Sequence, residues 1–315
     1  MNVFDWIVQL MGIALAVAAA PVFIGWVNQC RAWLQNKSAP SILQPYRGIR
    51  KLFHKDAVIA ENASRLFRLA PYVVFGAMVT AAAIIPSIAT RLPFTQAADA
   101  IALIGLLATA RVFVSLAAMD IGTPFGTLGA RREMMIGFLA EPALLVVIFV
   151  FSLQCATTAL PMIAERLSAQ AFALNPSLAI IAVALTMVLL AENARIPVDT
   201  PATHLELTMI HEALLLEYSA RHLALMEWAA ALKLLNYACI GIAVFIPWGI
   251  ATSHDPVSLA VSVTLLVVKL TVAGAALAFI ETVSAKLRVF RAPEFLATAF
   301  LFAVLGLLVR LLLGA

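Results

Sequence analysis

Long apolar runs dominate the sequence of this 315-residue chain. A helix of ~20 mostly apolar residues, rising about 1.5 Å per residue, crosses the ~30 Å hydrocarbon core of a bilayer. Eight runs approach or exceed that length, at residues 6–27, 69–90, 100–119, 134–160, 177–197, 224–250, 257–281 and 295–313. They raise the apolar content to 63%, whereas water-soluble domains stay near half. We therefore predict an all-α integral membrane protein, with residues 1–315 forming a single membrane domain of eight transmembrane helices.

The first run and the cysteines exclude several other classes of protein. Asp5 precedes this run without any Lys or Arg, so the run lacks the basic start of a secretory signal and is expected to remain as a span. Cys30, Cys155 and Cys239 form no CxxC pair and have no His at ligand spacing. We expect no disulfide framework, no metal site, no redox cofactor and no catalytic residue in this chain.

Basic residues sort to alternate connections between the runs. The connections after runs 1, 3, 5 and 7 hold 15 Lys and Arg when Arg195, at the end of run 5, is counted with them. The connections after runs 2, 4 and 6 hold only Arg91 and Arg166. The positive-inside rule then places the odd connections in the cytoplasm and both termini on the outer side. This sorting explains the sequence pI of about 9.1 without nucleic-acid binding. All long polar loops share the cytoplasmic face, which we expect to dock a partner.

Charged residues that fall within or near the apolar runs include Arg111, Glu141, Glu192, Lys233, Lys269 and Glu281. Each would cost at least ~2.5–3.5 kcal/mol at the bilayer centre, so each is expected to find a partner or a wet cavity. Arg111, Lys269 and Glu281 are interpreted as interhelical pairs or as side chains that reach an interface. Glu141, Glu192 and Lys233 are interpreted as a proton relay, because carboxylates and lysines are the usual proton carriers inside membranes.

Residues 192–222 hold five of the 17 acids and three of the five histidines. On a continuous helix, Glu192, Arg195 and Asp199 would share an arc of about 60°. Pro197 and Pro201 lie in the same stretch and would kink or end such a helix.

The stretch from His204 to His222 lacks Pro and Gly and is predicted to form a cytoplasmic-side amphipathic helix with two polar stripes. One interpretation is an interfacial helix whose His, Thr and Glu side chains face water. The other places one stripe against the cytoplasm or a partner and turns Glu206 and Glu217 toward an internal polar channel.

Three motifs carry a family resemblance: Gln44-Pro45 followed by RKLFHKD at 50–56, GARRE through EP at 129–142, and ENARIPVD through EYS at 192–219. In this order they resemble the family of complex I core subunit 1 over nearly the whole chain. Residues 203–228 resemble the membrane subunits of group 4 [NiFe] hydrogenases, such as hydrogenase-4 component C or formate hydrogenlyase subunit 4, more than the respiratory branch.

The chain also departs from the pattern of complex I subunit 1. Lys37-Ser38-Ala39-Pro40 stands where that family has Arg-x-Gly-Pro, and Gly48 stands where an acid is expected. Ala202 and His204 replace two further acids. These departures weigh against quinone binding.

The resemblance implies a noncatalytic, membrane-anchoring subunit of a hydrogenase-4 or formate-hydrogenlyase-like complex in a prokaryotic inner membrane. Its implied partners are hydrogenase-like large and small subunits with [NiFe] and iron–sulfur clusters, an iron–sulfur subunit, and antiporter-like membrane subunits. The implied proton path comprises Glu133, Glu141, Glu192, Asp199, Glu206, Glu212, Glu217 and Lys233. The residues implied to pair with the acids are Arg195, Arg132 and Arg221. Arg195 is expected to keep its neighbouring carboxylates charged. The residues implied to dock the peripheral electron-transfer arm are Gln44, Pro45, Arg50, Lys51, Lys55, Arg131 and Arg288.

Two alternatives remain open at this point. One is a quinone-binding subunit of an NADH:quinone oxidoreductase of the complex I type. The other is a stand-alone secondary transporter, which buried charges alone would suggest, although broken helices at matching places in two repeats are not visible in the sequence.

Overall fold

The computed structural model describes residues 3–90, 92–96, 99–169, 176–198, 210–252, 255–285, 287 and 291–313. This part of the chain is helical, with two isolated β-bridges. Its elements are α1 (Val3–Leu34), α2 (Gln44–Phe53), α3 (Arg65–Ile84), η1 (Pro93–Gln96), α4 (Ala100–Asp120), α5 (Pro124–Cys155), α6 (Leu160–Ala169), α7 (Pro176–Glu192), α8 (His211–Leu215), α9 (Ala220–Phe245), α10 (Pro256–Val283) and α11 (Ala292–Leu313).

Each predicted run corresponds to an apolar helix. Seven of these helices are long and apolar enough to cross a membrane: α1, α3, α4, α5, α9, α10 and α11. Helix α7 is shorter, with 17 residues. The chain is therefore a multi-pass membrane protein, and the all-α prediction is confirmed for the described residues.

Polar caps fix where several of these helices begin. Ser64 accepts a hydrogen bond from the Leu66 amide at 3.0 Å at the start of α3, and Asp99 accepts one from the Ile101 amide at 3.1 Å at the start of α4. Thr123 caps α5 in the same manner, with Pro124 at the first helical position. Such caps satisfy amide groups that have no partner within the helix.

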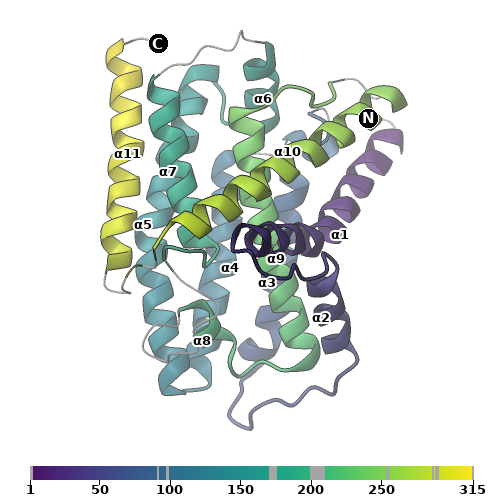
Figure 1. Ribbon diagram of the computed structural model, residues 1–315, viewed down its shortest axis with the longest axis vertical. Helices are drawn as coiled ribbons and strands as arrows, with labels where there is room; N and C mark the ends of the chain where they lie inside the picture. Colours follow the sequence, from purple (N-terminus) through teal and green to yellow (C-terminus); the bar gives the residue numbers. More distant parts are fainter. Residues whose placement is uncertain are drawn as a thin grey trace.

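Helix α9 lies at the centre of the bundle. It packs against α1, α3 and α7, while α5 packs against α4, α7 and α11. In Figure 1, α11 lies at one edge beside α7 and α5, and α10 crosses the front of the bundle obliquely. The most apolar window of α9 is 72% buried, against 22% for α10 and α11. Lipid is the natural solvent for the exposed apolar faces of the two outer helices.

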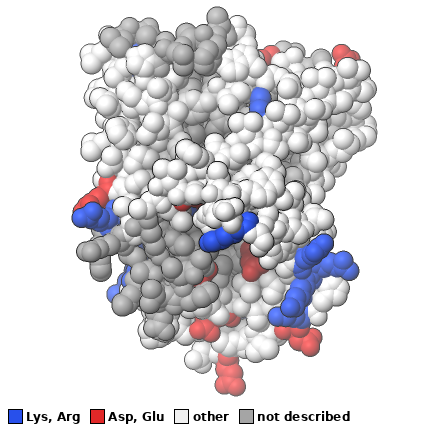
Figure 2. All heavy atoms as spheres, in the orientation of Figure 1, with Lys and Arg blue, Asp and Glu red and all other residues white. Residues whose placement is uncertain are grey.

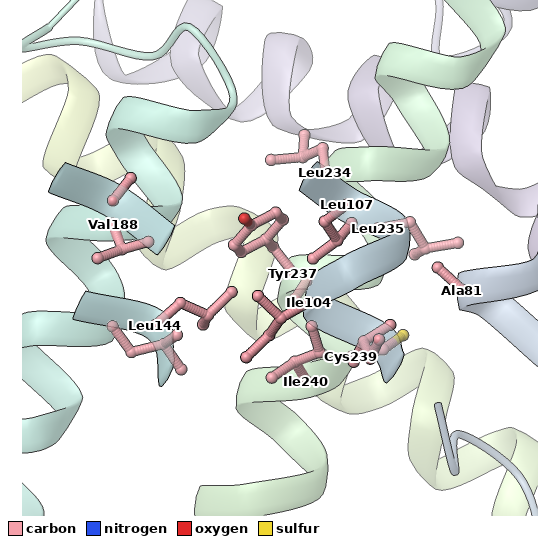
Figure 3. Packing of buried hydrophobic residues seen from close by; sticks show 14 of the residues in the cluster. Ala81, Ile104, Leu107, Leu144, Val188, Leu234, Leu235, Tyr237, Cys239 and Ile240 are labelled. Carbon is pink, nitrogen blue, oxygen red and sulfur yellow. The ribbon is translucent and has the colours of Figure 1, made fainter. Parts of the chain in front are cut away.

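The core joins the central helices through large buried side chains. Figure 3 shows Tyr237 of α9 among Leu107 of α4, Leu144 of α5 and Val188 of α7. Close packing of side chains holds helices together inside a bilayer, where the solvent is as apolar as the side chains.

Charged side chains concentrate at one end of the molecule. In Figure 2 the upper half of the visible face is mostly uncharged, and Lys and Arg gather below, over α2 and the nearby loop. Helix α1 begins and helix α11 ends toward the top of Figure 1. This arrangement agrees with loops that share one polar face.

The structure corrects two predictions about the charged segment. Helix α7 ends at Glu192, and Ala194 has a φ of 52°, so Arg195 does not continue the helical face of Glu192. The proposed helix from 204 to 222 is not continuous, because α8 ends at Leu215 and α9 begins only at Ala220. His222 therefore belongs to the central helix, where it is buried. Residues 199–209 lie outside the described part.

Gly306 sets the contact between α11 and α7. A Cβ at this position would lie 2.5 Å from Cγ1 of Ile181, which is fully buried. We predict that Gly306→Ala lowers the free energy of unfolding by about 1–3 kcal/mol, because the two helices must separate. Thermal unfolding in detergent or nanodiscs measures the effect.

Gly76→Ala is the matched control, since a Cβ there meets nothing within 4 Å. It should unfold at or slightly above the wild-type temperature, because Ala favours helix over Gly. Equal behaviour of the two variants would contradict the proposed contact.

Candidate functional site

Arg111 lies at the centre of a buried ion-pair network. Its side chain is only 5% exposed on α4. Its Nε lies 3.4 Å from Oε1 of Glu133, its Nη1 lies 2.6 Å from Oε1 of Glu141, and its Nη2 donates to Oε1 of Glu192. A planar guanidinium with five N–H donors suits several carboxylates at once. Arg111 thus joins α4 to both α5 and α7.

Helix α5 carries a glycine between two acids on one face, and this glycine leaves space for the Arg111 side chain. Glu133, Gly137 and Glu141 follow one another at intervals of four, so they share one face of the helix. A Cβ at Gly137 would lie 2.2 Å from Nη1 of Arg111. The glycine therefore gives the guanidinium access to the two acids that flank it.

Further groups extend the network at both ends. Nζ of Lys233 lies 2.9 Å from Oε2 of Glu192. At the other end, Nε2 of His211 lies 3.1 Å from Oε2 of Glu133. A continuous series of contacts therefore leads from His211 through Glu133, Arg111 and Glu192 to Lys233. In this order the five residues lie on α8, α5, α4, α7 and α9.

The acids of this network of described residues outnumber its fixed cations. Three carboxylates face the two fixed cations Arg111 and Lys233. Glu133 and Glu192 are almost fully buried, whereas the Glu141 side chain is 34% exposed. Because an uncompensated buried charge is costly, the surplus negative charge makes the network a favourable place for an additional cation or proton.

A cavity of about 110 Å³ lies beside the network. Arg111, Glu133, His211 and Lys233 line its polar side, and apolar residues of α3, α4, α8 and α9 line the rest. A water molecule needs roughly 10–15 Å³ of such space and two to four polar partners. The cavity is therefore large enough for several waters between His211 and Lys233, with the polar groups that line it as their partners.

A second ion-pair cluster surrounds Glu281 on α10. Its buried carboxylate lies 3.5 Å from Nη1 of Arg31 and 3.3 Å from Nη1 of Arg195. Arg195 thus pairs with Glu281, and the prediction that it holds Glu192 charged is wrong in this structure. Glu192 is held instead by Arg111 and Lys233.

The predicted pairing of the other intramembrane charges is confirmed. Arg111 pairs with Glu192 of α7, and Glu281 pairs with Arg31 of α1. Nζ of Lys269 donates to the carbonyl oxygen of Ile246 at 2.7 Å and to that of Trp248. These carbonyls follow the end of α9, where a cation is favoured.

Four of the predicted proton-path residues come together: Glu133, Glu141, Glu192 and Lys233. Glu212 lies half-buried on α8, and Glu217 is exposed in the turn before α9. This exposure favours the interpretation in which Glu217 faces water over the one in which it faces an internal channel. Asp199 and Glu206 lie outside the described residues.

The predicted docking residues lie mostly at the surface. Gln44, Arg50, Lys51, Lys55 and Arg131 are exposed, and Pro45 is half-buried. Of the predicted charge-pairing residues on α5 and α9, Arg132 is half-buried and Arg221 is exposed. Arg288 lies outside the described part.

Sequence reasoning missed the roles of Arg111, Gly137 and His211 in this site. Arg111 was expected only to form a pair, and His211 was assigned to a polar stripe. The spacing of Glu133, Gly137 and Glu141 is the signal that would have identified the site, because two acids and a glycine on one face favour a buried cation.

Known proteins resemble the chain over almost its whole length. The model of the family described as NADH dehydrogenase matches residues 7–312. Formate hydrogenlyase subunit 4 of Escherichia coli (strain K12) is 32% identical over 289 residues, which cover 92% of this chain and 93% of that protein. Hydrogenase-4 component C of the same organism is 36% identical over 251 residues, or 79% of this chain and 77% of that protein.

A solved structure shares the fold. It is a chain of the membrane-bound sulfane sulfur reductase, an archaeal respiratory membrane complex, with a TM-score of 0.80 and 18% identity over 96% of this chain and 98% of that one. The family match over residues 7–312, together with the relative that is 32% identical over 92% of this chain, shows that the chain belongs to the NADH dehydrogenase family of complex I subunit 1 type.

Proposed function

We propose that the chain is the membrane-anchoring, proton-path subunit of a respiratory complex of the hydrogenase-4 or formate hydrogenlyase type. The two curated relatives carry those names, and the fold is that of a chain in a respiratory membrane complex. The observation that carries the proton-path role is the buried chain from His211 to Lys233, whose members come from five helices. The electron-transfer chemistry, at [NiFe] and iron–sulfur clusters, would belong to partner subunits.

The geometry suggests how a proton passes through this network. A guanidinium does not lose its proton at physiological pH, so Arg111 cannot relay one itself. It keeps Glu133 and Glu192 close together, and the adjoining cavity lets waters connect His211 and Glu133 with Lys233. Lys233 and Glu192 would exchange the proton at the far end, since they are 2.9 Å apart.

The charged end of the molecule is proposed as the docking surface for the peripheral arm. Helix α2 has Arg50 and Lys51 in its last turn, both exposed, and Arg131 is exposed on α5. Basic side chains on a mostly apolar protein offer a partner an electrostatic recognition surface.

Co-purification tests the assignment to this type of complex. A tag on this chain should bring down hydrogenase-like large and small subunits, with nickel and iron in the same fraction. Metal analysis and subunit mass spectrometry provide the measurement. Recovery with iron but without nickel, and with quinone bound, would favour the complex I type instead.

Glu133→Gln and Glu192→Gln test the proton path. Each substitution keeps the shape of the side chain but removes the proton acceptor. We predict that proton movement coupled to electron transfer falls by roughly tenfold or more, because positioned acid–base groups contribute ~10²–10⁴-fold to proton transfer. Proton uptake per electron, measured in vesicles that contain the assembled complex, reports the change.

Glu217→Gln is the matched control, because Glu217 is exposed and outside the network. It should leave the coupling unchanged. Subunit content must be checked in parallel, since an unpaired Arg111 could itself destabilise the fold. Full coupling in correctly assembled Glu133→Gln and Glu192→Gln complexes would remove both residues from the path.

Gly137→Ala tests the geometry without changing any charge. The added methyl would meet Nη1 of Arg111 at 2.2 Å and displace the guanidinium from its carboxylates. We predict a several-fold loss of coupled proton movement, because misplacement by about 1 Å can cost up to 10²-fold. Gly105→Ala on α4 is the control, since a Cβ there meets nothing within 4 Å, and unchanged coupling in both variants would contradict the model.

A further inference from the structure

A polar cavity of about 440 Å³ lies between the end of α1 and the segment that leads into α2. The side chains that give it its chemistry are Asn28, Arg31, Gln35, Lys37, Ser41 and Gln44. It contains no member of the Arg111 network, so the proposed proton path does not account for it. Its volume falls within the ~300–1,000 Å³ range of small-molecule sites.

The cavity is positively charged. None of its lining residues is acidic, and two are cations. Arg31 shares the single carboxylate of Glu281 with Arg195, so this cluster of described residues keeps a net positive charge. Lys37 contacts the neutral Oε1 of Gln35 at 3.0 Å. Hydroxyl and amide groups surround the two cations, which is the combination that phosphate oxygens prefer.

The two backbone segments that border the cavity, the end of α1 and the segment before α2, are packed closely against each other. A Cβ at Gly25 of α1 would lie 1.9 Å from the carbonyl oxygen of Ile42, so the segment before α2 rests directly on the α1 backbone. Nη2 of Arg31 also donates to Oδ1 of Asn28 at 3.4 Å. A site formed in this way loses little conformational entropy when a ligand binds.

Tryptophans near the cavity indicate the level of the membrane surface. The rings of Trp26 and Trp33 meet edge to face with centroids 5.8 Å apart, and Nε1 of Trp26 donates to the carbonyl of Thr271. Trp33 is 55% exposed and Leu34 is 49% exposed, and both lie in the same last turn of α1 as Ala32, which lines the cavity. Tryptophan is enriched at the headgroup level of membranes, and exposed apolar side chains there contact acyl chains.

We propose that this cavity binds the headgroup of an anionic phospholipid, with Arg31 and Lys37 on the phosphate oxygens. The positive charge selects an anion. The exposed Trp33 and Leu34 at this end of α1 indicate the level of the membrane surface, where an anion with an acyl chain is favoured over free phosphate. The site lies at the charged end of the molecule, which the basic loops assign to the cytoplasmic leaflet, whose surface is negative. Binding here does not depend on the proposed proton path.

Lipid titration of the purified, assembled complex tests this inference. Native mass spectrometry would measure retention of phosphatidylglycerol and of phosphatidylcholine with the same acyl chains, for wild type and Lys37→Gln. We expect wild type to prefer phosphatidylglycerol, and Lys37→Gln to weaken its binding about fivefold, the share of one basic residue. Lys55→Gln removes an exposed cation outside the cavity and should bind as wild type does.

Arg31→Gln provides a second variant and should weaken phosphatidylglycerol binding further, with subunit content checked because Arg31 also contacts Glu281. Inorganic phosphate is the competitor. Displacement of the lipid by millimolar phosphate would make the cavity a site for free phosphate and overturn the proposal. Equal retention of the two lipids, or unchanged binding in Lys37→Gln, would overturn it as well.

Discussion

The burial of Arg111 is the constraint on which the rest of the structure depends. A guanidinium keeps its charge in any environment a protein offers, so an apolar helix that carries one must supply carboxylates from its neighbours. Glu133 and Glu141 lie on the same face of α5 with Gly137 between them, and α7 ends at Glu192, beside the same side chain. Lys233, on the central helix, then compensates part of this excess of acid.

The turn after Glu192 shows how irregular backbone is accommodated in this bundle. The amide of Arg195 donates to the carbonyl of Leu190, and that of Val198 donates to the carbonyl of Arg195. The carbonyl of Pro197 accepts from the Leu287 amide. Irregular backbone at membrane depth is tolerated when protein satisfies its polar groups, and here it also brings Arg195 to Glu281.

The two ion-pair clusters differ in the balance of their charges. The Arg111 network has more acids than fixed cations and adjoins a cavity, which suits the uptake and release of a proton. The Glu281 cluster has more cations than acids and opens on a polar cavity at the end of α1, which suits an anion. One family fold thus separates a buried proton site from a surface that recognises lipid, and both roles are our proposals.

Hydropathy and charge along the sequence are enough to predict the membrane class, the places of the apolar helices and the need of each intramembrane charge for a partner. These properties are local, because they follow from the length of an apolar run and from the cost of a bare charge in hydrocarbon. The tertiary structure decided which partners meet: Glu192 is 81 positions from Arg111, and Glu281 is 86 positions from Arg195. Distant contacts also stabilise the irregular segments after Glu192 and at 216–219: the Leu287 amide donates to the carbonyl of Pro197, and the Ser219 hydroxyl bonds to both backbone groups of Val58. Helical periodicity alone therefore does not predict where α7 and α8 end.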